Sequence, residues 1–290
     1  RASPVRIPSG HARIMERKDR GSQRCPRSGL PPCVAAGMGG CVLIALLVAA
    51  AFAAGLVDAI AGGGGIITLP ALLAAGLDPH IALATNKGQS VFGSGSAVVQ
   101  FARGGEVDRS RAIVSFLAAL IASLAGARIV LWIDPSLLRP LVLVLLLLAG
   151  AAALGRKPEG GRPIGFATRH PLWLAGIIAG VVGGYDGFFG PGTGTFLIVA
   201  YAWLFGDRLV RASGNAKVAN FASNLGAFAL FAAAGVIRWE LAIPMGVAQA
   251  VGAWAGTKLT IRRGGGLVRA AAFVVCLALA ARVAWQLVRG

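Results

Sequence analysis

Two acidic residues each precede a glycine-rich interruption of an apolar segment. Asp58 is followed by four consecutive glycines at 62–65, and Asp186 is followed by Gly-Pro-Gly-Thr-Gly at 190–194. The two acids are 128 positions apart, and the glycines at 62 and 64 fall on those at 190 and 192 with the same offset. An acid within apolar sequence is costly in lipid and usually marks a functional site. The pattern predicts a duplicated unit that carries an acid and a flexible backbone.

A polar stripe headed by a lysine follows each glycine run. Lys87, Ser90 and Ser94 have the i, i+3, i+7 spacing that places side chains on one helical face. An offset of 130 brings the second copy into register, with Lys217, Asn220 and Asn224. Asn86 and Asn215 flank the two lysines. Two cations with paired hydroxyl and amide donors are suited to a small oxyanion, so all these residues are candidate substrate ligands.

The glycine runs themselves are candidate anion sites. Each glycine costs about 1 kcal/mol relative to alanine within a helix, so the helix should open at each run and face a cavity or packed protein. A helix that resumes near Ile66 or Thr195 would begin with free N–H groups and a positive dipole end. The backbone candidates are Gly63, Gly64, Gly192 and Thr193. Small residues that allow close helix packing are the alternative interpretation.

The acids and lysines each allow more than one role. Asp58 and Asp186 could neutralise the lysines in an empty site, carry protons that couple transport to a gradient, or cap the resumed helices. A lysine near a helix end could instead extend to the lipid headgroups. The in-register duplication favours an interior site with Lys87 and Lys217 facing an anion.

Composition predicts an all-α, polytopic membrane helix bundle. Of the 290 residues, 56% are hydrophobic and 13% are charged, which is more apolar surface than a soluble fold of this length can bury. About eight crossings are expected if the short runs 66–76 and 195–205 are second pieces of broken helices. The expected spans are 38–60, 83–102, 111–133, 136–154, 171–186, 214–235, 239–259 and 266–288. We expect one repeat at 34–155, a basic connecting loop at 156–170 and a second repeat at 171–290.

The net charge of +17 is interpreted through membrane topology and not as a sign of a nucleic-acid partner. Residues 1–33 form a basic tail without apolar period, predicted to be disordered. Because the chain begins with Arg, this tail is compatible with a mistaken start ahead of Met15 or Met38. The positive-inside rule favours a cytoplasmic N-terminus, but counting each broken helix as one crossing puts the basic loop 258–269 on the opposite side. Parallel and inverted repeats both remain open.

The sequence resembles the TauE/SafE-type sulfite exporter family over roughly residues 38–288. The residues that carry the resemblance are Asp58-Ala-Ile-Ala-Gly-Gly-Gly-Gly-Ile-Ile-Thr-Leu-Pro70, Ala84-Thr-Asn-Lys87, Tyr185-Asp-Gly-Phe-Phe-Gly-Pro-Gly-Thr-Gly194 and Ala216-Lys-Val-Ala-Asn-Phe-Ala-Ser-Asn224. The resemblance implies a bacterial inner-membrane permease with two repeated halves. It also implies export of sulfite, sulfoacetate or related organosulfur anions, and no cofactor. The basic tail departs from the family pattern.

Two other functions were weighed. An intramembrane aspartyl protease could use Asp186 and Asp58 as a proton-sharing dyad, but Asp58 follows Leu56-Val57 and so lacks the Gly-x-Gly-Asp context expected of the second acid. A non-transporting scaffold explains the apolar spans but gives no reason for two lysine stripes. The chain has no phosphate-binding loop of the G-x-x-x-x-G-K-[ST] type, and the four cysteines lack metal-ligand spacing. We therefore expect a secondary transporter of a small anion, without a metal and without enzyme activity.

Overall fold

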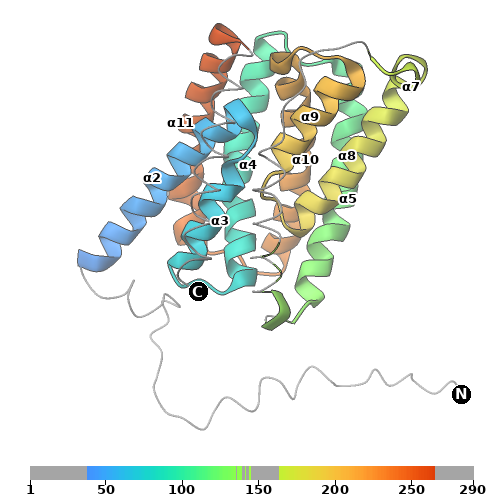
Figure 1. Cartoon of the computed structure of the whole chain (residues 1–290). Coiled ribbons are helices and arrows are strands. Elements are labelled where there is room, and N and C mark those ends of the chain that lie inside the picture. Colours follow the sequence, from blue (N-terminus) through green and yellow to red (C-terminus); the bar gives the residue numbers. More distant parts are fainter. Residues whose placement is uncertain (1–37, 135, 139–140, 142–143, 145–162, 265–290) are drawn as a thin grey trace, which may run out of the picture.

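The computed structural model describes residues 38–134, 136–138, 141, 144 and 163–264, and every regular element among them is a helix (Figure 1). The predicted all-α membrane bundle is confirmed. The helices are α2 (Met38–Ala61), α3 (Gly64–Ala74), α4 (Pro79–Arg103), α5 (Arg109–Trp132), α7 (Gly165–Arg169), α8 (Pro171–Phe188), α9 (Thr193–Phe205), α10 (Leu209–Ala233) and α11 (Trp239–Arg263). The tail 1–33 and the predicted span 266–288 lie outside the described residues, as does nearly all of the span 136–154.

Both glycine runs are turns between two antiparallel helices. Gly62 has a φ of +83°, a conformation that favours glycine, and the chain then folds back beside α2. A Cβ on Gly64 would lie only 3.0 Å from the Ala54 oxygen, ten residues earlier. The same reversal joins α8 to α9. The expectation that α3 and α9 continue the broken helices is therefore wrong: each returns toward the end from which its partner came (Figure 1).

The two sets of helices run in opposite directions. In Figure 1, α4 rises from the lower end of the bundle to the upper end, whereas its counterpart α10 descends. The α2–α3 hairpin opens toward the lower end, and the α8–α9 hairpin opens toward the upper end. The structure thus answers the question of parallel or inverted repeats in favour of an inverted arrangement.

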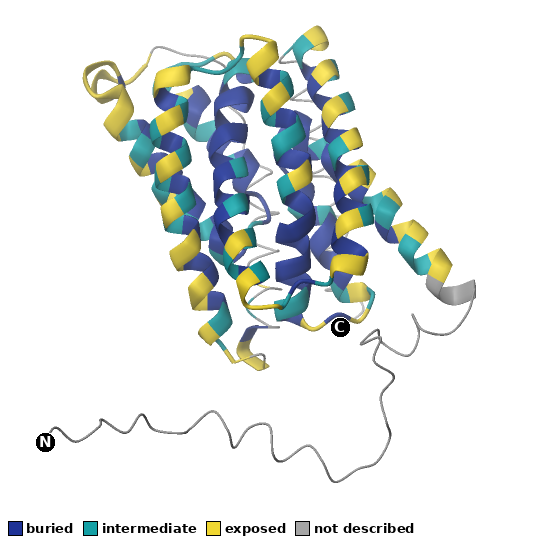
Figure 2. Cartoon of the chain, turned by 180° about the vertical axis from the view of Figure 1, so that it is seen from behind, coloured by how far each residue is buried: buried dark blue, intermediate teal, exposed yellow. Residues whose placement is uncertain are grey.

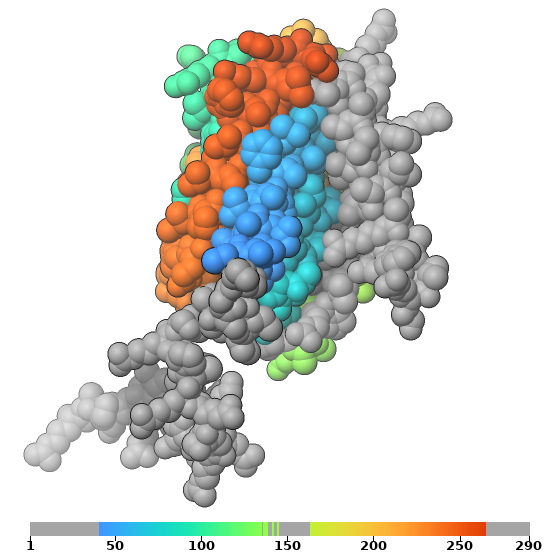
Figure 3. All heavy atoms as spheres, turned by 90° about the vertical axis from the view of Figure 1, so that its left-hand side faces the viewer, coloured from blue at the N-terminus to red at the C-terminus, as the bar shows by residue number. Residues whose placement is uncertain are grey.

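The first helix of each set packs on the last helix of the other set. α2 lies along α11, as the space-filling view in Figure 3 shows, and α8 lies along α5. Glycines permit the close approach: a Cβ on Gly252 would lie 2.1 Å from the Phe52 oxygen, and one on Gly187 would lie 2.2 Å from the Ser123 oxygen. Close packing by small residues thus accounts for these glycines.

The central helices α4 and α10 are the most enclosed part of the bundle. Figure 2 shows them largely buried, with exposed residues gathered on the outer helices. Among the described residues, three helices are long and apolar enough to cross a membrane by length and composition alone: Cys41–Ala61, Arg109–Trp132 and Pro171–Phe188. α4 and α10 are as long, but they carry the buried polar stripes predicted from sequence.

One end of the bundle collects most of the described surface cations. The α4–α5 turn meets α10 there, since Asp108 N donates to Asn215 Oδ1, and the end of α11 is adjacent because a Cβ on Gly104 would contact Ile261. The surface cations of this basic end are Arg103, Arg109, Arg169, Arg208, Arg211, Lys258, Arg262 and Arg263, and Arg111 is buried beside them.

This arrangement corrects the predicted topology. The described part of the loop 258–269 lies on the same side as the other basic loops, because the hairpins do not cross as continuous helices. The positive-inside rule then places the basic end in the cytoplasm. α2 begins at the opposite end, which removes the reason for expecting a cytoplasmic N-terminus.

Candidate functional site

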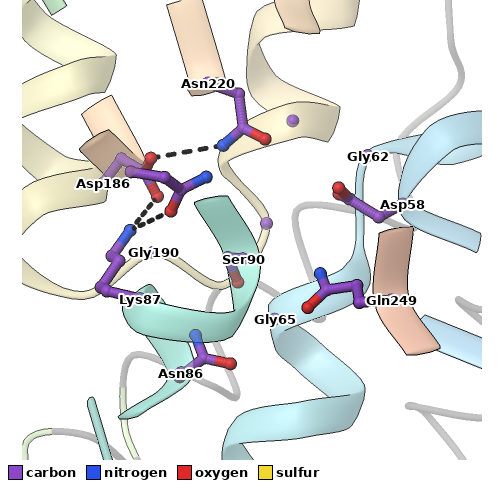
Figure 4. A pocket seen from close by; sticks show the side chains of 13 residues that line it. Asp58, Gly62, Gly65, Asn86, Lys87, Ser90, Asp186, Gly190, Asn220 and Gln249 are labelled. Atoms are coloured by element: carbon purple, nitrogen blue, oxygen red, sulfur yellow. Dashed lines mark hydrogen bonds and ion pairs between the residues drawn. The ribbon is translucent and has the colours of Figure 1, made fainter. Parts of the chain in front are cut away.

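A small polar cavity lies where the two hairpin turns meet the middle of α4, α10 and α11 (Figure 4). Both predicted acids reach it, Asp58 from α2 and Asp186 from α8. Its other lining residues are Gly62, Gly65, Asn86, Lys87, Ser90, Gly190, Gly192, Gly194, Asn220, Asn224 and Gln249. The volume is about 20 Å³, which is room for about one water molecule. A larger solute therefore requires side chains or hairpins to move.

The hairpin turns touch one another at the cavity. Thr195 N donates to the Gly62 carbonyl oxygen at 3.1 Å, and Thr195 Oγ1 donates to the Ala61 oxygen at 2.8 Å. A Cβ on Gly194 would lie 2.6 Å from Gly62 Cα, so only glycine fits this approach. The starts of α3 and α9 thus face the same small volume from opposite sides, which brings their positive dipole ends together.

Lys87 pairs with the acid of the other repeat. Its Nζ lies 2.6 Å from Asp186 Oδ1 and also donates to Asn224 Oδ1 at 3.0 Å. Asp186 accepts further hydrogen bonds from Asn220 Nδ2 at 3.3 Å, from Thr193 Oγ1 at 3.0 Å and from the Ser223 hydroxyl. With only 1% of Asp186 exposed, this carboxylate is held by four side-chain donors. Most of its interactions would survive the departure of Lys87.

Lys217 pairs with Asp58 in the equivalent crossed arrangement, but with fewer partners. Lys217 Nζ lies 2.8 Å from Asp58 Oδ2, an ion pair without the geometry of a hydrogen bond, so this fully buried ammonium donates none. Among the described residues, Asp58 accepts only one hydrogen bond, from Gly64 N at 3.3 Å, and it is 9% exposed. The contact with Gly64 N is the helix-capping interaction that the sequence left open, here combined with a counter-ion to lysine.

The structure brings most of the predicted ligands together. The cavity is lined by Asn86, Lys87, Ser90, Asn220, Asn224, Gly192 and both acids. Thr193 contacts the site through its hydrogen bond to Asp186. Asn86 Oδ1 is already occupied by Thr68 Oγ1 at 2.5 Å and Gln89 Nε2 at 3.1 Å.

Several predicted ligands lie elsewhere. Ser94 Oγ donates to the Ser90 backbone oxygen at 2.6 Å within α4, a local bond common for serine in helices. Asn215 connects Asp108 N with Asp207 Oδ2 at the basic end, a structural role. Gly63 and Gly64 form the turn but do not line the cavity, where Gly62 and Gly65 take their place. Lys217 pairs with Asp58 but is not among the residues that line the cavity.

Sequence reasoning missed Gln249 and Ser223. Gln249 is on α11, far from the duplicated motifs, and its counterpart by the offset of 130 is Ala119. Ser223 likewise corresponds to Gly93. A search restricted to matching pairs could not find residues that differ between the repeats. A single glutamine inside the apolar run 239–259 was the available signal.

The side chains of the site are electrically balanced, with two ammonium groups against two carboxylates. Each carboxylate is paired with a lysine, and no hydrogen bond joins these two described carboxylates to each other. This arrangement is unlike a proton-sharing aspartyl dyad. Adding an anion to a balanced buried site is costly unless a proton enters as well, because an uncompensated buried charge is strongly unfavourable.

Comparison with known proteins gives one consistent result. The model of the family "Sulfite exporter TauE/SafE" matches residues 47–283. A probable membrane transporter protein, ORF9, of Sinorhizobium sp is 37% identical over 241 residues, which cover 83% of this chain and 92% of that protein. The probable membrane transporter protein YfcA of Escherichia coli K12 is 36% identical over 245 residues, covering 84% and 91%. No solved structure matches the chain at a significant level.

Proposed function

This chain belongs to the sulfite exporter TauE/SafE family and is a multi-pass transporter of the bacterial inner membrane, and we propose that it exports a small oxyanion, such as sulfite or an organosulfonate, together with a proton. The observation that carries the proposal is the crossed pairing of Lys87 with Asp186 and of Lys217 with Asp58 at one small cavity. Anion binding explains why two lysines are buried here, whereas a scaffold function does not.

Lys87 is the proposed anion-binding cation because it lines the cavity. When its ammonium turns from Asp186 to the anion, Asp186 keeps its bonds to Asn220, Thr193 and Ser223 and can remain charged. Asn220 and Ser90 also line the cavity and complete the set of hydrogen-bonding groups. The starts of α3 and α9 add their dipoles.

Asp58 is the proposed proton site because little else holds its charge. Apart from Lys217 it has one hydrogen bond to a backbone N–H. A proton on Asp58 would balance the charge of an anion bound at Lys87, so the two bind together and move together. Net movement then follows the combined gradients of anion and proton, and a high cytoplasmic anion concentration drives export.

The inverted hairpins offer the conformational change. The α2–α3 hairpin opens toward one end of the bundle and the α8–α9 hairpin toward the other, and their tips close the cavity between them. Separation of one hairpin at a time would expose the site to one side of the membrane. The basic end is the cytoplasmic side, so α8–α9 is the proposed inner gate.

The test is efflux of [³⁵S]sulfite from proteoliposomes that contain the purified protein. We expect efflux above that from empty vesicles, faster with an acidic interior and slower with an acidic exterior. Lys87→Ala should remove the protein-dependent component, whereas Lys258→Ala, which replaces a lysine stacked on Trp254 near the basic end, should not. Equal efflux from protein-containing and empty vesicles would refute sulfite as cargo.

A further inference from the structure

Gln249 is a buried polar residue that lines the cavity. It is 1% exposed, and its Oε1 has no hydrogen-bond partner among the residues that the structure describes. Figure 4 shows its side chain directed into the space between Asp58 and Gly65. A buried acceptor without a donor is costly, so such groups commonly belong to binding sites that a ligand completes.

The surrounding helices leave space for this one side chain. A Cβ on Gly93 of α4 would lie 2.6 Å from Gln249 Cγ, and a Cβ on Gly55 of α2 would lie 2.2 Å from the Gln249 backbone oxygen. Any larger residue at these positions would displace α11 or its glutamine.

The other repeat fills the equivalent space differently. Ala119 replaces the glutamine, and Ser223 replaces Gly93. The Ser223 hydroxyl donates to Asp186. Around Asp186 the serine hydroxyl is therefore paired within the protein. Around Asp58, in contrast, Gln249 Oε1 lacks a donor among the described residues.

We propose that Gln249 is a direct ligand of the transported anion, and that its carbonyl oxygen accepts a hydrogen bond from a protonated oxygen of that anion. This inference rests on the proposed function and narrows it. The cargo is a monoprotonated oxyanion, of which hydrogen sulfite is the smallest member of the proposed class. Lys87 holds the charged side of the anion and Gln249 recognises its acidic proton.

The comparison of two pyramidal anions tests this directly. Chlorate has the same charge and three oxygens as hydrogen sulfite but carries no proton. At a mildly acidic pH, where sulfite is mainly hydrogen sulfite, binding of [³⁵S]sulfite to the reconstituted protein gives its affinity, and competition gives that of chlorate. The wild type should prefer hydrogen sulfite by about tenfold, because chlorate leaves the buried oxygen unpaired.

Gln249→Leu should bring this ratio close to one, mainly by weakening hydrogen sulfite. Gly93→Ala keeps the amide but pushes it out of place, and it should lower the ratio in the same direction. Thr257→Val is the matched control, since Thr257 is on the same helix, is fully buried and has an unpartnered hydroxyl, but does not line the cavity. Its ratio should equal that of the wild type.

The outcomes separate the two proposals. An unchanged ratio in Gln249→Leu, with sulfite still bound, would overturn the role of Gln249 alone. A wild-type protein that binds neither anion would overturn the proposed function and this inference with it. If Gln249→Leu fails to fold, the ratio in Gly93→Ala decides, and a wild-type ratio there would contradict the inference.

Discussion

The two buried carboxylates occupy equivalent positions in the two repeats but are held very differently. Asp186 has a lysine and three neutral side-chain donors, whereas Asp58 has a lysine and one backbone N–H. Hydrogen bonds stabilise the charged form of a carboxylate. The proposed division of tasks, with anion binding at Lys87–Asp186 and proton binding at Asp58–Lys217, rests on this difference in donors.

Loss of the cavity lysine should have the largest effect. Lys87→Ala removes a charge-assisted contact to the anion, and sulfite efflux should fall by about 10- to 100-fold. Asp186 keeps its three neutral donors, so the variant should still insert and purify as a folded protein. Efflux from proteoliposomes and a thermal melt measure the two effects. Near-normal efflux in a folded Lys87→Ala protein would show that Lys87 does not bind the anion.

Lys217→Ala should abolish proton coupling and leave anion exchange intact. Without its lysine, Asp58 keeps one hydrogen bond and should remain protonated, because an unpaired buried charge is unfavourable. We therefore expect exchange of sulfite for sulfite to continue while dependence on the proton gradient disappears. If Lys217→Ala and Lys87→Ala behave alike in both assays, the division of tasks is wrong.

Replacing each acid by asparagine should have different effects, on proton coupling for Asp58 and on anion affinity for Asp186. Asp58→Asn should lose gradient-driven efflux and retain exchange, since the carboxylate proposed to carry the proton is gone. Asp186→Asn should bind sulfite several-fold more tightly and release it slowly, because Lys87 has lost its competing carboxylate. It should still respond to the gradient. Gradient-driven efflux at the wild-type rate in Asp58→Asn would exclude Asp58 as the proton site.

Removing a residue that sequence reasoning placed in the site should affect stability instead of transport. Asn215→Ala leaves Asp108 N without its acceptor at the start of α5. The substitution should lower the free energy of unfolding by about 1–3 kcal/mol. Sulfite affinity should stay at the wild-type value. A selective loss of affinity in Asn215→Ala would restore it as a ligand.

The bundle and much of its site were predictable because the duplication is visible in the sequence. Matching offsets found Asp58, Asp186 and both lysines, and their burial in apolar sequence indicated an interior site. The reversal of the chain at Gly62 was not predictable, because a glycine run interrupts a helix but does not fix the direction of the segment that follows. Which lysine pairs with which acid also depends on how the inverted repeats interlock. Gln249 has no counterpart and so gave no repeat signal.

The basic end provides a smaller, pH-dependent effect. Burial raises the pKa of Asp108, but hydrogen bonds and charge from Arg111, with the charge of Arg211, outweigh it, and the pKa lies below the ordinary 3.8. Because its pKa is lower in the folded protein, Asp108 stabilises the fold at pH values above its pKa in the unfolded chain. This stabilisation is lost as the pH falls through its pKa in the folded protein. Melting temperature should therefore drop below about pH 4, less steeply in Asp108→Asn. An identical acid profile in that variant would contradict the assignment.

The pH dependence of chlorate binding tests the coupled uptake of anion and proton most directly, because chlorate itself does not titrate. The account predicts that wild-type affinity falls as pH rises, with a limiting slope of about tenfold per pH unit, since one proton binds with each anion. Asp58→Asn should bind chlorate with no such dependence, and Asp186→Asn should keep the wild-type slope. A flat wild-type profile, or the same slope in Asp58→Asn, would contradict the account.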